Sequence, residues 1–310
     1  MKRLLLSCLL LAMSGPLWAD ASLLERLVGG FSRDGLWKNV QARCLTPPAP
    51  THADCVVVDR QQGFVLYKDA IGASHYLIIP DQPVTGVDDA RIWGDAVQPN
   101  QWAFGWDARG AVARAVGKPL PDTLPGLAIN SKASRSQDQL HIHLDCISEA
   151  ARDFLSGGSG TIDTRWRDLR FRGRPVRAIL IPATQPTLAV NPFDVVRQGQ
   201  DAPVTAGMAD RGVFMAYVRQ PGGVSGFVVV DDPVDKAAGS TGHASDFLDR
   251  GCKLARALPA DARPAEGVST VRVPADGAQH AGDRQIGGQQ IGAQPIGAQP
   301  IGEREAAPAR

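Results

Sequence analysis

The sequence is poor in aromatic residues, in net charge and in histidine. Phe, Trp and Tyr make up 6% of the 310 residues, and 33 Lys and Arg face 32 Asp and Glu, which leaves a net charge of +1 at pH 7. Nucleic-acid binding needs a basic field, so this balance excludes that class of partner. The cysteines show no CxxC spacing, which makes a structural zinc site unexpected. Only six histidines occur, so the two that lie one residue apart, His141 and His143, mark the most informative segment.

Long apolar runs are also missing, except near the N-terminus. Lys2 and Arg3 precede an apolar stretch over residues 4–13, and Ala19-Asp20-Ala21 follows as a small-x-small cleavage pattern. A basic start, an apolar stretch of about a dozen residues and a small-residue cleavage site are typical of an export signal. The stretch is shorter than the roughly 20 apolar residues of a relaxed transmembrane helix. Residues 1–21 are therefore expected to be a signal peptide or a signal-anchor.

The C-terminal residues differ in composition from the rest. From about Pro259 onward Ala, Gly, Pro and Gln dominate, and a pentapeptide of the type Gln290-Ile291-Gly292-Ala293-Gln294 repeats. One apolar residue in five cannot bury a core, so 259–310 is predicted to be a disordered tail. The residues between signal and tail, 22–258, are expected to form the folded catalytic domain.

Four cysteines follow the N-terminal segment, whose apolar stretch holds a fifth, Cys8. In an exported chain an even number of cysteines indicates disulfides, and four cysteines allow three pairings. Cys44 and Cys55 are close in sequence and flank a Pro-rich turn. This favours Cys44–Cys55 together with Cys146–Cys252.

Short apolar runs separated by turn residues predict a strand-rich fold. The patterns predict strands at 55–59, 63–68, 75–80, 127–129, 139–146, 165–171, 176–181, 213–218 and 226–230, and helices at 22–38, 100–116, 148–155 and 245–254.

Residues 139–144 alternate between polar and apolar side chains, which predicts a half-buried strand. Gln139, His141 and His143 then share one face, and the apolar residues between them point into the core. An imidazole can attack phosphorus and leave again, so such a face suits phosphoryl or nucleotidyl transfer. The loop before it offers cations and neutral donors to a diphosphate: Asn130, Ser131, Lys132, Ser134, Arg135, Ser136 and Gln137.

Two other interpretations of the histidine pair stay open. The pair could hold a metal with Glu149, Asp145 or His243 as third ligand, although none of these has a diagnostic spacing. The pair could also be exposed side chains without chemistry. The Ser/Lys/Arg loop beside it favours phosphate chemistry, for which we expect neither metal nor cofactor.

The stretch NSKASRSQDQLHIH (130–143) closely resembles the bacterial CDP-diacylglycerol pyrophosphatases, which are relatives of the histidine-triad nucleotide hydrolases and transferases. The similarity extends, in order, to HYLIIP (75–80), VTGVD (84–88), NPF (191–193) and SDFLDRGC (245–252). The resemblance implies an α+β fold in which an antiparallel sheet carries packed helices, with the histidine strand at its centre. It also allows a second, degenerate copy of the same half.

Histidine-triad proteins carry His-x-His-x-His, and Gln139 stands at the first of these positions. The resemblance makes His141 the nucleophile and His143 a phosphate contact and proton donor. It implies that His141 attacks the cytidine-side phosphorus of CDP-diacylglycerol, that phosphatidate leaves, and that water releases CMP from the cytidylyl-histidine. Lys132 and Arg135 would offset the charge of the diphosphate.

A diacylated substrate stays in the bilayer, so the expected location is the periplasmic face of the inner membrane. The expected partners are CDP-diacylglycerol and the membrane surface, and the sequence indicates no oligomeric state. Two other function classes stay open: a soluble periplasmic nucleotide pyrophosphatase or nucleotidyltransferase, and a non-catalytic exported binding module. Only the lipid hydrolase should need detergent or vesicles, and the binding module should turn nothing over.

Overall fold

The computed structural model describes residues 32–259, with gaps at 47, 49, 51, 94–99, 159, 200–206 and 221. The predicted signal segment, the first part of the predicted 22–38 helix and the repeat tail lie outside the described residues. The chain divides into two compact units, Met1–Gly277 and Ala278–Arg310, and everything below concerns the first. Within the described part, no helix combines the length and the apolar character needed to cross a bilayer.

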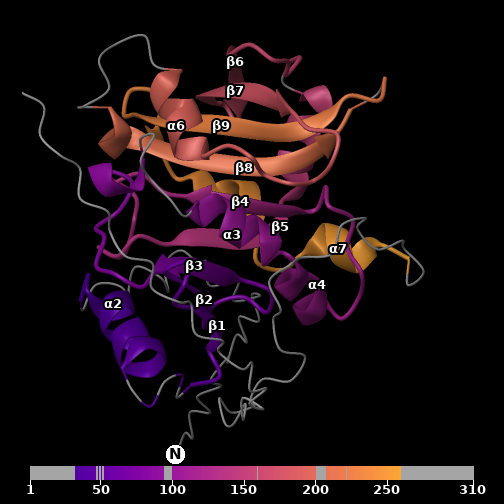
Figure 1. Cartoon of the computed structure of the whole chain (residues 1–310). Helices are drawn as coiled ribbons and strands as arrows, with labels where there is room; N and C mark the ends of the chain where they lie inside the picture. The colour runs from indigo at the N-terminus through magenta and orange to yellow at the C-terminus, as the bar shows by residue number, and fades with distance from the viewer. Residues whose placement is uncertain are drawn as a thin grey trace, which may run out of the picture. The chain divides into compact units, whose positions relative to one another are not determined.

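The core of this unit is an antiparallel sheet, and with several short helices it makes the chain an α+β protein, as predicted. Figure 1 shows the strands side by side in the order β1-β2-β3-β5-β4-β8-β9-β7-β6. Two further short strands lie off this path, β10 paired with β9 and β11 paired with β5. The strands of the described residues are β1 (Cys55–Asp59), β2 (Phe64–Lys68), β3 (Tyr76–Pro80), β4 (Pro125–Ile129), β5 (Ile142–Ile147), β6 (Arg167–Phe171), β7 (Arg174–Pro182), β8 (Arg211–Arg219), β9 (Ser225–Asp235), β10 (Ser240–Thr241) and β11 (Leu248–Asp249).

The sheet consists of two halves with the same connections. In the first half, β2 and β3 form a hairpin, helices follow, and β4 and β5 form a second hairpin whose last strand pairs with β3. In the second half, β6 to β9 repeat this pattern, with β9 pairing β7. The halves join where β4 and β8 run antiparallel, from Gly126 opposite Ala216 to Ile129 opposite Val213. The topology thus bears out a duplicated half.

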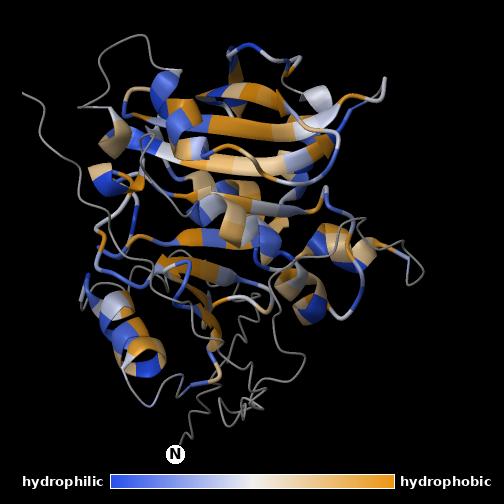
Figure 2. Cartoon of the chain, in the orientation of Figure 1, coloured by the Kyte–Doolittle hydropathy of each residue, from blue (hydrophilic) through white to orange (hydrophobic). Residues whose placement is uncertain are grey.

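Hydropathy explains why β8 and β9 lie inside the sheet. Both strands contain seven consecutive buried residues, and Figure 2 shows them apolar along most of their length. A strand covered on both faces needs such a continuous apolar run. β7 instead alternates between buried and partly exposed residues, and the outermost β6 is largely exposed. The sequence patterns of these strands therefore match their positions.

Helices pack on both faces of the sheet. α3 and α6 lie on the same face of the sheet (Figure 1), and the rings of Trp102 and Phe193 meet edge to face with centroids 5.2 Å apart. The described helices are α2 (Gly35–Val40), α3 (Gln101–Asp107), α4 (Gly110–Val116), α5 (Glu149–Asp153), α6 (Pro192–Gln198) and α7 (Lys253–Ala257), with π turns at Gln41–Leu45 and Phe154–Gly158 and 3-10 turns at Ala90–Ile92, Met208–Asp210 and Ala244–Phe247.

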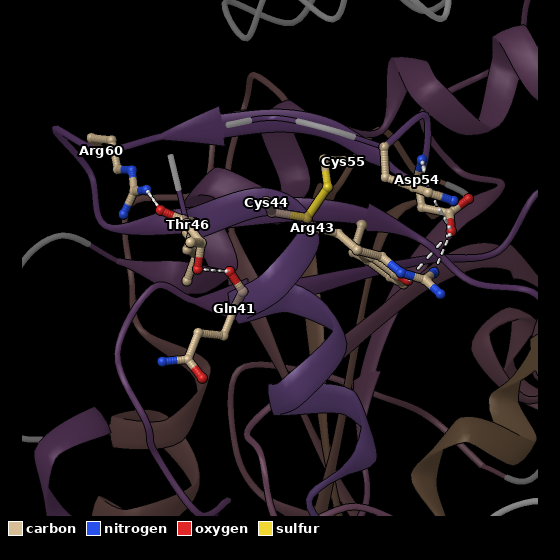
Figure 3. Close-up of a disulfide and its surroundings, with 10 residues drawn as sticks. Gln41, Arg43, Cys44, Thr46, Asp54, Cys55 and Arg60 are labelled. Carbon is tan, nitrogen blue, oxygen red and sulfur yellow. Dashed lines mark hydrogen bonds and ion pairs between the residues drawn. A yellow bond between two sulfur atoms is a disulfide. The ribbon is translucent and has the colours of Figure 1, made fainter. Parts of the chain in front are cut away.

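A smaller core lies on the opposite face of β1–β3. Val40 and the Cys44–Cys55 disulfide pack there against the side chains of β2 and β3 that point away from α3. Figure 3 shows this disulfide joining the end of the helical segment to β1, with Arg43 reaching Asp54 at 3.2 Å. The predicted pairing of Cys44 with Cys55 and of Cys146 with Cys252 is confirmed.

Two helix predictions were wrong. The predicted 100–116 helix is two helices joined by a tighter turn. There the carbonyl of Trp106 accepts from the backbone amide of Arg109 at 3.2 Å and from its Nη1 at 2.9 Å, in place of the Gly110 amide that a continuous helix would use. The predicted 245–254 helix is a 3-10 turn, the strand β11 and the start of α7. β11 forms because Leu248 and Asp249 pair with the end of β5.

Candidate active site

His143 lies in the middle of the sheet. It belongs to β5, which pairs on one side with β3 and on the other with β4, so that His143 faces Leu77 and Ala128 across the two ladders. Only 4% of the residue is exposed. The predicted strand began at Gln139, but β5 begins at Ile142, and His141 directly precedes it. The two imidazoles are still neighbours, with centroids 4.9 Å apart and planes at 82°.

A relay of hydrogen bonds fixes the proton on His143. His75 Nδ1 lies 3.2 Å from both a carboxylate oxygen of Asp69 and the carbonyl of Ile71. Both oxygens accept, so Nδ1 of His75 carries its proton. In a neutral His75 the other nitrogen, Nε2, must then accept, and it lies 2.9 Å from His143 Nδ1. His143 therefore donates from Nδ1 and keeps the lone pair on Nε2.

Asn130 agrees with this assignment from the other end. Its side-chain oxygen accepts a hydrogen bond from the Ser245 amide at 3.0 Å, which orients the amide group. Its Nδ2 then points at His143 Nε2, at 3.5 Å, and an amide nitrogen can only donate. Asn130, His143, His75 and Asp69 thus form one chain of groups with a single consistent direction.

His141 has its own proton fixed by the backbone. Its Nδ1 lies 2.6 Å from the carbonyl oxygen of Gln139, two residues earlier. Because that oxygen only accepts, Nδ1 carries the proton and Nε2 carries the lone pair. An imidazole in this tautomer presents Nε2 as a nucleophile or base.

The charge on this cluster is set by burial and by its neighbours. Burial lowers the pKa of His143 well below its ordinary value, and the charges that Arg250 carries and that His141, His75 and His243 would carry when protonated act in the same direction, so this ring is neutral. Burial also acts on Asp69 and raises its pKa, but the hydrogen bond from His75 and the charge that His75 gains when protonated outweigh it and bring that pKa down to about 2. Asp69 is therefore the ionised end of the relay.

The cations of the predicted phosphate loop are paired with carboxylates. Arg135 is buried and contacts both Asp88 and Asp138. Lys132 is exposed, and its Nζ lies 3.1 Å from Asp88. Asp138 also accepts from Arg33 at 2.5 Å. Lys132 and Arg135 are thus close to the histidines in sequence. The carboxylates of Asp88 and Asp138 already compensate much of their positive charge.

The neutral donors of the loop also have structural contacts. Ser131 Oγ and Ser134 Oγ donate to the carbonyl of Thr241 at 2.7 and 3.1 Å. Gln137 Oε1 accepts from the backbone of Leu36 at 2.8 Å, and Ser136 is exposed. The loop therefore ties the histidine strand to the C-terminal segment and to α2.

Gln139 is held against the segment that follows β3. Its Nε2 donates to the carbonyl of Gln82 at 3.1 Å, and its Oε1 accepts from the amide of Val84 at 3.3 Å. The residue is 1% exposed. Gln139 thus positions the chain just before His141, and its side chain is bonded to backbone rather than directed at a ligand.

Sequence reasoning missed the residues behind His143. His75 and Ser245 belong to the segments of family similarity, but no pattern assigns them a role in the site, and no pattern marks Asp69. A signal did exist, because one of only six histidines directly precedes the apolar run 76–80. Its pairing with His143, 68 residues away, depends on the β3–β5 ladder.

The second disulfide closes the site. Cys146 follows His143 on β5, and its bond to Cys252 holds the C-terminal segment against that strand. Among the described residues, Asp145, Cys146 and Cys252 are grouped closely enough to hold a metal, but the two sulfur atoms are joined to each other. Glu149 and His243 do not belong to that group.

Comparison with known proteins gives a consistent result. The sequence profile of the CDP-diacylglycerol pyrophosphatase family matches residues 31–256. The chain is 37% identical to the CDP-diacylglycerol pyrophosphatase of Yersinia pestis over 139 residues, which are 44% of this chain and 53% of that protein. It is 35% identical over 162 residues to a Mycobacterium leprae protein described as "Probable CDP-diacylglycerol pyrophosphatase", over 52% of this chain and 58% of the other. The chain thus spans a little over half the length of these curated relatives.

Proposed function

Because the chain belongs to the CDP-diacylglycerol pyrophosphatase family, we propose that it hydrolyses the pyrophosphate bond of CDP-diacylglycerol to CMP and phosphatidate. The observation that carries this proposal is the tautomer of His141. The Gln139 carbonyl holds the proton on Nδ1, which leaves Nε2 to form a bond with phosphorus.

The first step is the attack of His141 on the cytidine-side phosphorus. The Nε2–P bond forms, the bond from phosphorus to the bridging oxygen breaks, and phosphatidate leaves with that oxygen. The product is a cytidylyl-histidine, as in the histidine-triad enzymes to which we relate this site. The Nδ1–H bond to the Gln139 carbonyl stabilises the positive charge that the ring gains.

Asn130 donates to a phosphate oxygen in this scheme, because its Nδ2 carries two protons and only one of them is directed at His143 Nε2. His143 can donate to a phosphate oxygen only after its Nε2 has gained a proton. His143 is kept neutral chiefly by burial. The relay from Asp69 through His75 fixes its orientation, so His75 and Asp69 are positioning residues. In the second step water attacks the phosphorus, the bond to His141 breaks, and CMP leaves.

We place the enzyme at the outer face of the inner membrane. The support is the predicted export signal and the chemistry of the substrate, because a lipid with two acyl chains stays in the bilayer. Flotation of the purified chain with phospholipid vesicles tests this location, and recovery of the protein only in the vesicle-free fraction would contradict it.

The test of the reaction is CMP release from CDP-diacylglycerol in mixed micelles, with wild type beside His141→Ala. Loss of the nucleophile should lower the rate by more than about 10³-fold. His52→Ala is the matched control, since His52 is half-exposed and pairs only with Asp54 in the described residues around the first disulfide. Far-UV circular dichroism would show that the variants are folded.

Three results would contradict the proposal. Equal rates for wild type and His141→Ala would remove His141 as nucleophile. Faster cleavage of water-soluble CDP-alcohols than of the lipid, without a need for detergent, would favour the soluble pyrophosphatase. Binding of the lipid with no turnover by wild type would favour the binding module.

A further inference from the structure

The C-terminal segment 240–252 forms one wall of the histidine site. It is held at both ends, because β10 pairs with β9 and β11 pairs with β5. Between these strands, the Ser245 amide donates to Asn130, whose Nδ2 lies 3.5 Å from His143 Nε2. The side chain of Asn130 therefore links this segment to His143.

Close packing fixes the position of His243 within this segment. The carbonyl of the preceding Gly242 accepts from the Ser131 amide at 2.9 Å. Gly242 has φ +66°, and a Cβ at this position would come 2.8 Å from the Cβ of Ser131. Only glycine fits there without strain. His243 is thus placed by the same loop that precedes the histidine strand.

His243 has a carboxylate behind its ring. Its Nδ1 lies 2.9 Å from an oxygen of Asp246, and the other oxygen of Asp246 pairs with Arg174 at 3.0 Å. The carboxylate only accepts, so Nδ1 carries the proton and Nε2 carries the lone pair. Ser245 Oγ lies 3.3 Å from that Nε2. A carboxylate in this position orients an imidazole and stabilises the imidazolium that forms when Nε2 takes a proton.

His243 is better suited than His143 to exchange protons with water. The His143 residue is 4% exposed, and burial lowers its pKa. The His243 side chain is 35% exposed, so a proton that it takes up can pass on to solvent. A base that acts in every catalytic cycle needs such a path.

We propose that His243 is the general base that activates water for hydrolysis of the cytidylyl-His141 intermediate, an inference that rests on the proposed function. The water oxygen forms a bond with phosphorus, and the phosphorus–nitrogen bond to His141 breaks, with its electron pair returning to Nε2. The water proton goes to Nε2 of His243. CMP leaves, and His243 then releases the proton to solvent.

The test separates the two chemical steps. In a rapid-quench experiment with CDP-diacylglycerol in mixed micelles, phosphatidate reports the first step and CMP reports the second. For His243→Ala we expect a burst of phosphatidate approaching one per enzyme, followed by CMP release about 10²-fold slower than in wild type. Intact mass spectrometry should then find the cytidylyl-enzyme, and added imidazole should speed the release of CMP. Asp246→Asn should show the same pattern in weaker form, and His52→Ala should behave as wild type.

Three results would overturn the inference. Equal slowing of phosphatidate and CMP in His243→Ala, without a trapped adduct, would give His243 no part in the second step. Equal slowing together with a lowered urea midpoint would make the role of His243 structural. Unchanged kinetics would remove it from the reaction. Failure of the proposed function looks different, because wild type and His243→Ala would then both produce no phosphatidate.

Discussion

Asn100 and Asn191 each donate a hydrogen bond across to the other half of the sheet. Asn100 Nδ2 donates to the carbonyl of Val190 at 2.9 Å, and Asn191 Nδ2 donates to the carbonyl of Ile92 at 3.3 Å. Each side-chain oxygen also caps its own helix, α3 or α6. These helices occupy equivalent places in the two repeated halves, so the asparagines join the halves as well as beginning the helices.

Asn191→Ala should therefore lower the free energy of unfolding by more than the loss of a helix cap alone would. Removing a helix cap costs about 1 kcal/mol, and the lost bond to Ile92 adds about another 1 kcal/mol. Ser148→Ala is the control, because Ser148 caps α5 through its bond to the Ala151 amide at 3.2 Å and makes only a long contact, 3.5 Å, with the carbonyl of Asp246. Urea unfolding measures both, and equal losses for the two variants would show that the bond across the halves contributes nothing.

Gln139→His should lower activity rather than raise it, although it restores the residue of the histidine-triad pattern. The amide of Gln139 donates to Gln82 and accepts from Val84 at the same time, and an imidazole has a different spacing between donor and acceptor. The backbone that fixes His141 would then shift. A displacement of about 1 Å at a catalytic group can cost about 10²-fold in rate.

The measurement is CMP release by Gln139→His beside Gln61→His, a control in an exposed turn. Activity equal to wild type in Gln139→His would mean that the two bonds do not position His141.

Stability should fall as the pH rises from about 4 to about 6 because of Asp145. Burial raises the pKa of this carboxyl to about 6, and its Oδ2 has no hydrogen-bond partner among the described residues. In the unfolded chain the pKa is about 3.9, so the folded state holds the extra proton between these values. The folded state then loses about 3 kcal/mol of stability as the pH rises through this window, and no more above it.

Asp145→Asn removes this titration. The free energy of unfolding is measured with urea at about pH 4, 5, 6 and 7. Relative to wild type, the value for the variant should rise up to about pH 6 and then stay constant. A difference that is the same at every pH would contradict the expectation.

The two disulfides should differ in their contributions. Cys44 and Cys55 close a loop of 11 residues, whereas Cys146 and Cys252 close one of 106. Loop-closure entropy predicts about 3 kcal/mol for a short loop and about 5 kcal/mol for the long one. The double variant Cys146→Ser/Cys252→Ser should therefore lose more stability than Cys44→Ser/Cys55→Ser.

The long-loop variant should also lose activity while still folded, because Cys252 anchors the segment that carries Ser245 and His243. CMP release measured below the urea transition of each variant checks this. Full activity without the Cys146–Cys252 bond would show that β11 and β10 hold the segment alone.

The sequence was sufficient to predict much of the sheet. The strands at 55–59, 63–68 and 75–80 and the long strands of the second half follow from apolar runs bounded by turn residues. Both disulfide pairings followed from the predicted export signal and from the spacing of the cysteines. These features depend on local pattern, which a single sequence contains.

The contacts between distant segments could not be predicted in this way. The pairing of His75 with His143 depends on the register of two strands. Leu248 and Asp249 have helix-compatible neighbours, but the ladder with β5 makes them a strand. The neutralisation of Arg135 depends on Asp88, 47 residues earlier. In each case tertiary packing overrides the local signal.

The pairing of β11 with β5 determines when the site can be completed during synthesis of the chain. β11 is among the last elements of the described chain, yet it pairs with the strand that carries His143, and Cys252 lies three residues beyond it. The site described above is therefore incomplete in any nascent chain shorter than about 252 residues. A ribosome-bound or truncated intermediate would contain His141, His143 and the whole first half but lack the wall that holds Asn130. The proposed hydrolysis would thus need almost all of the described residues to have been made.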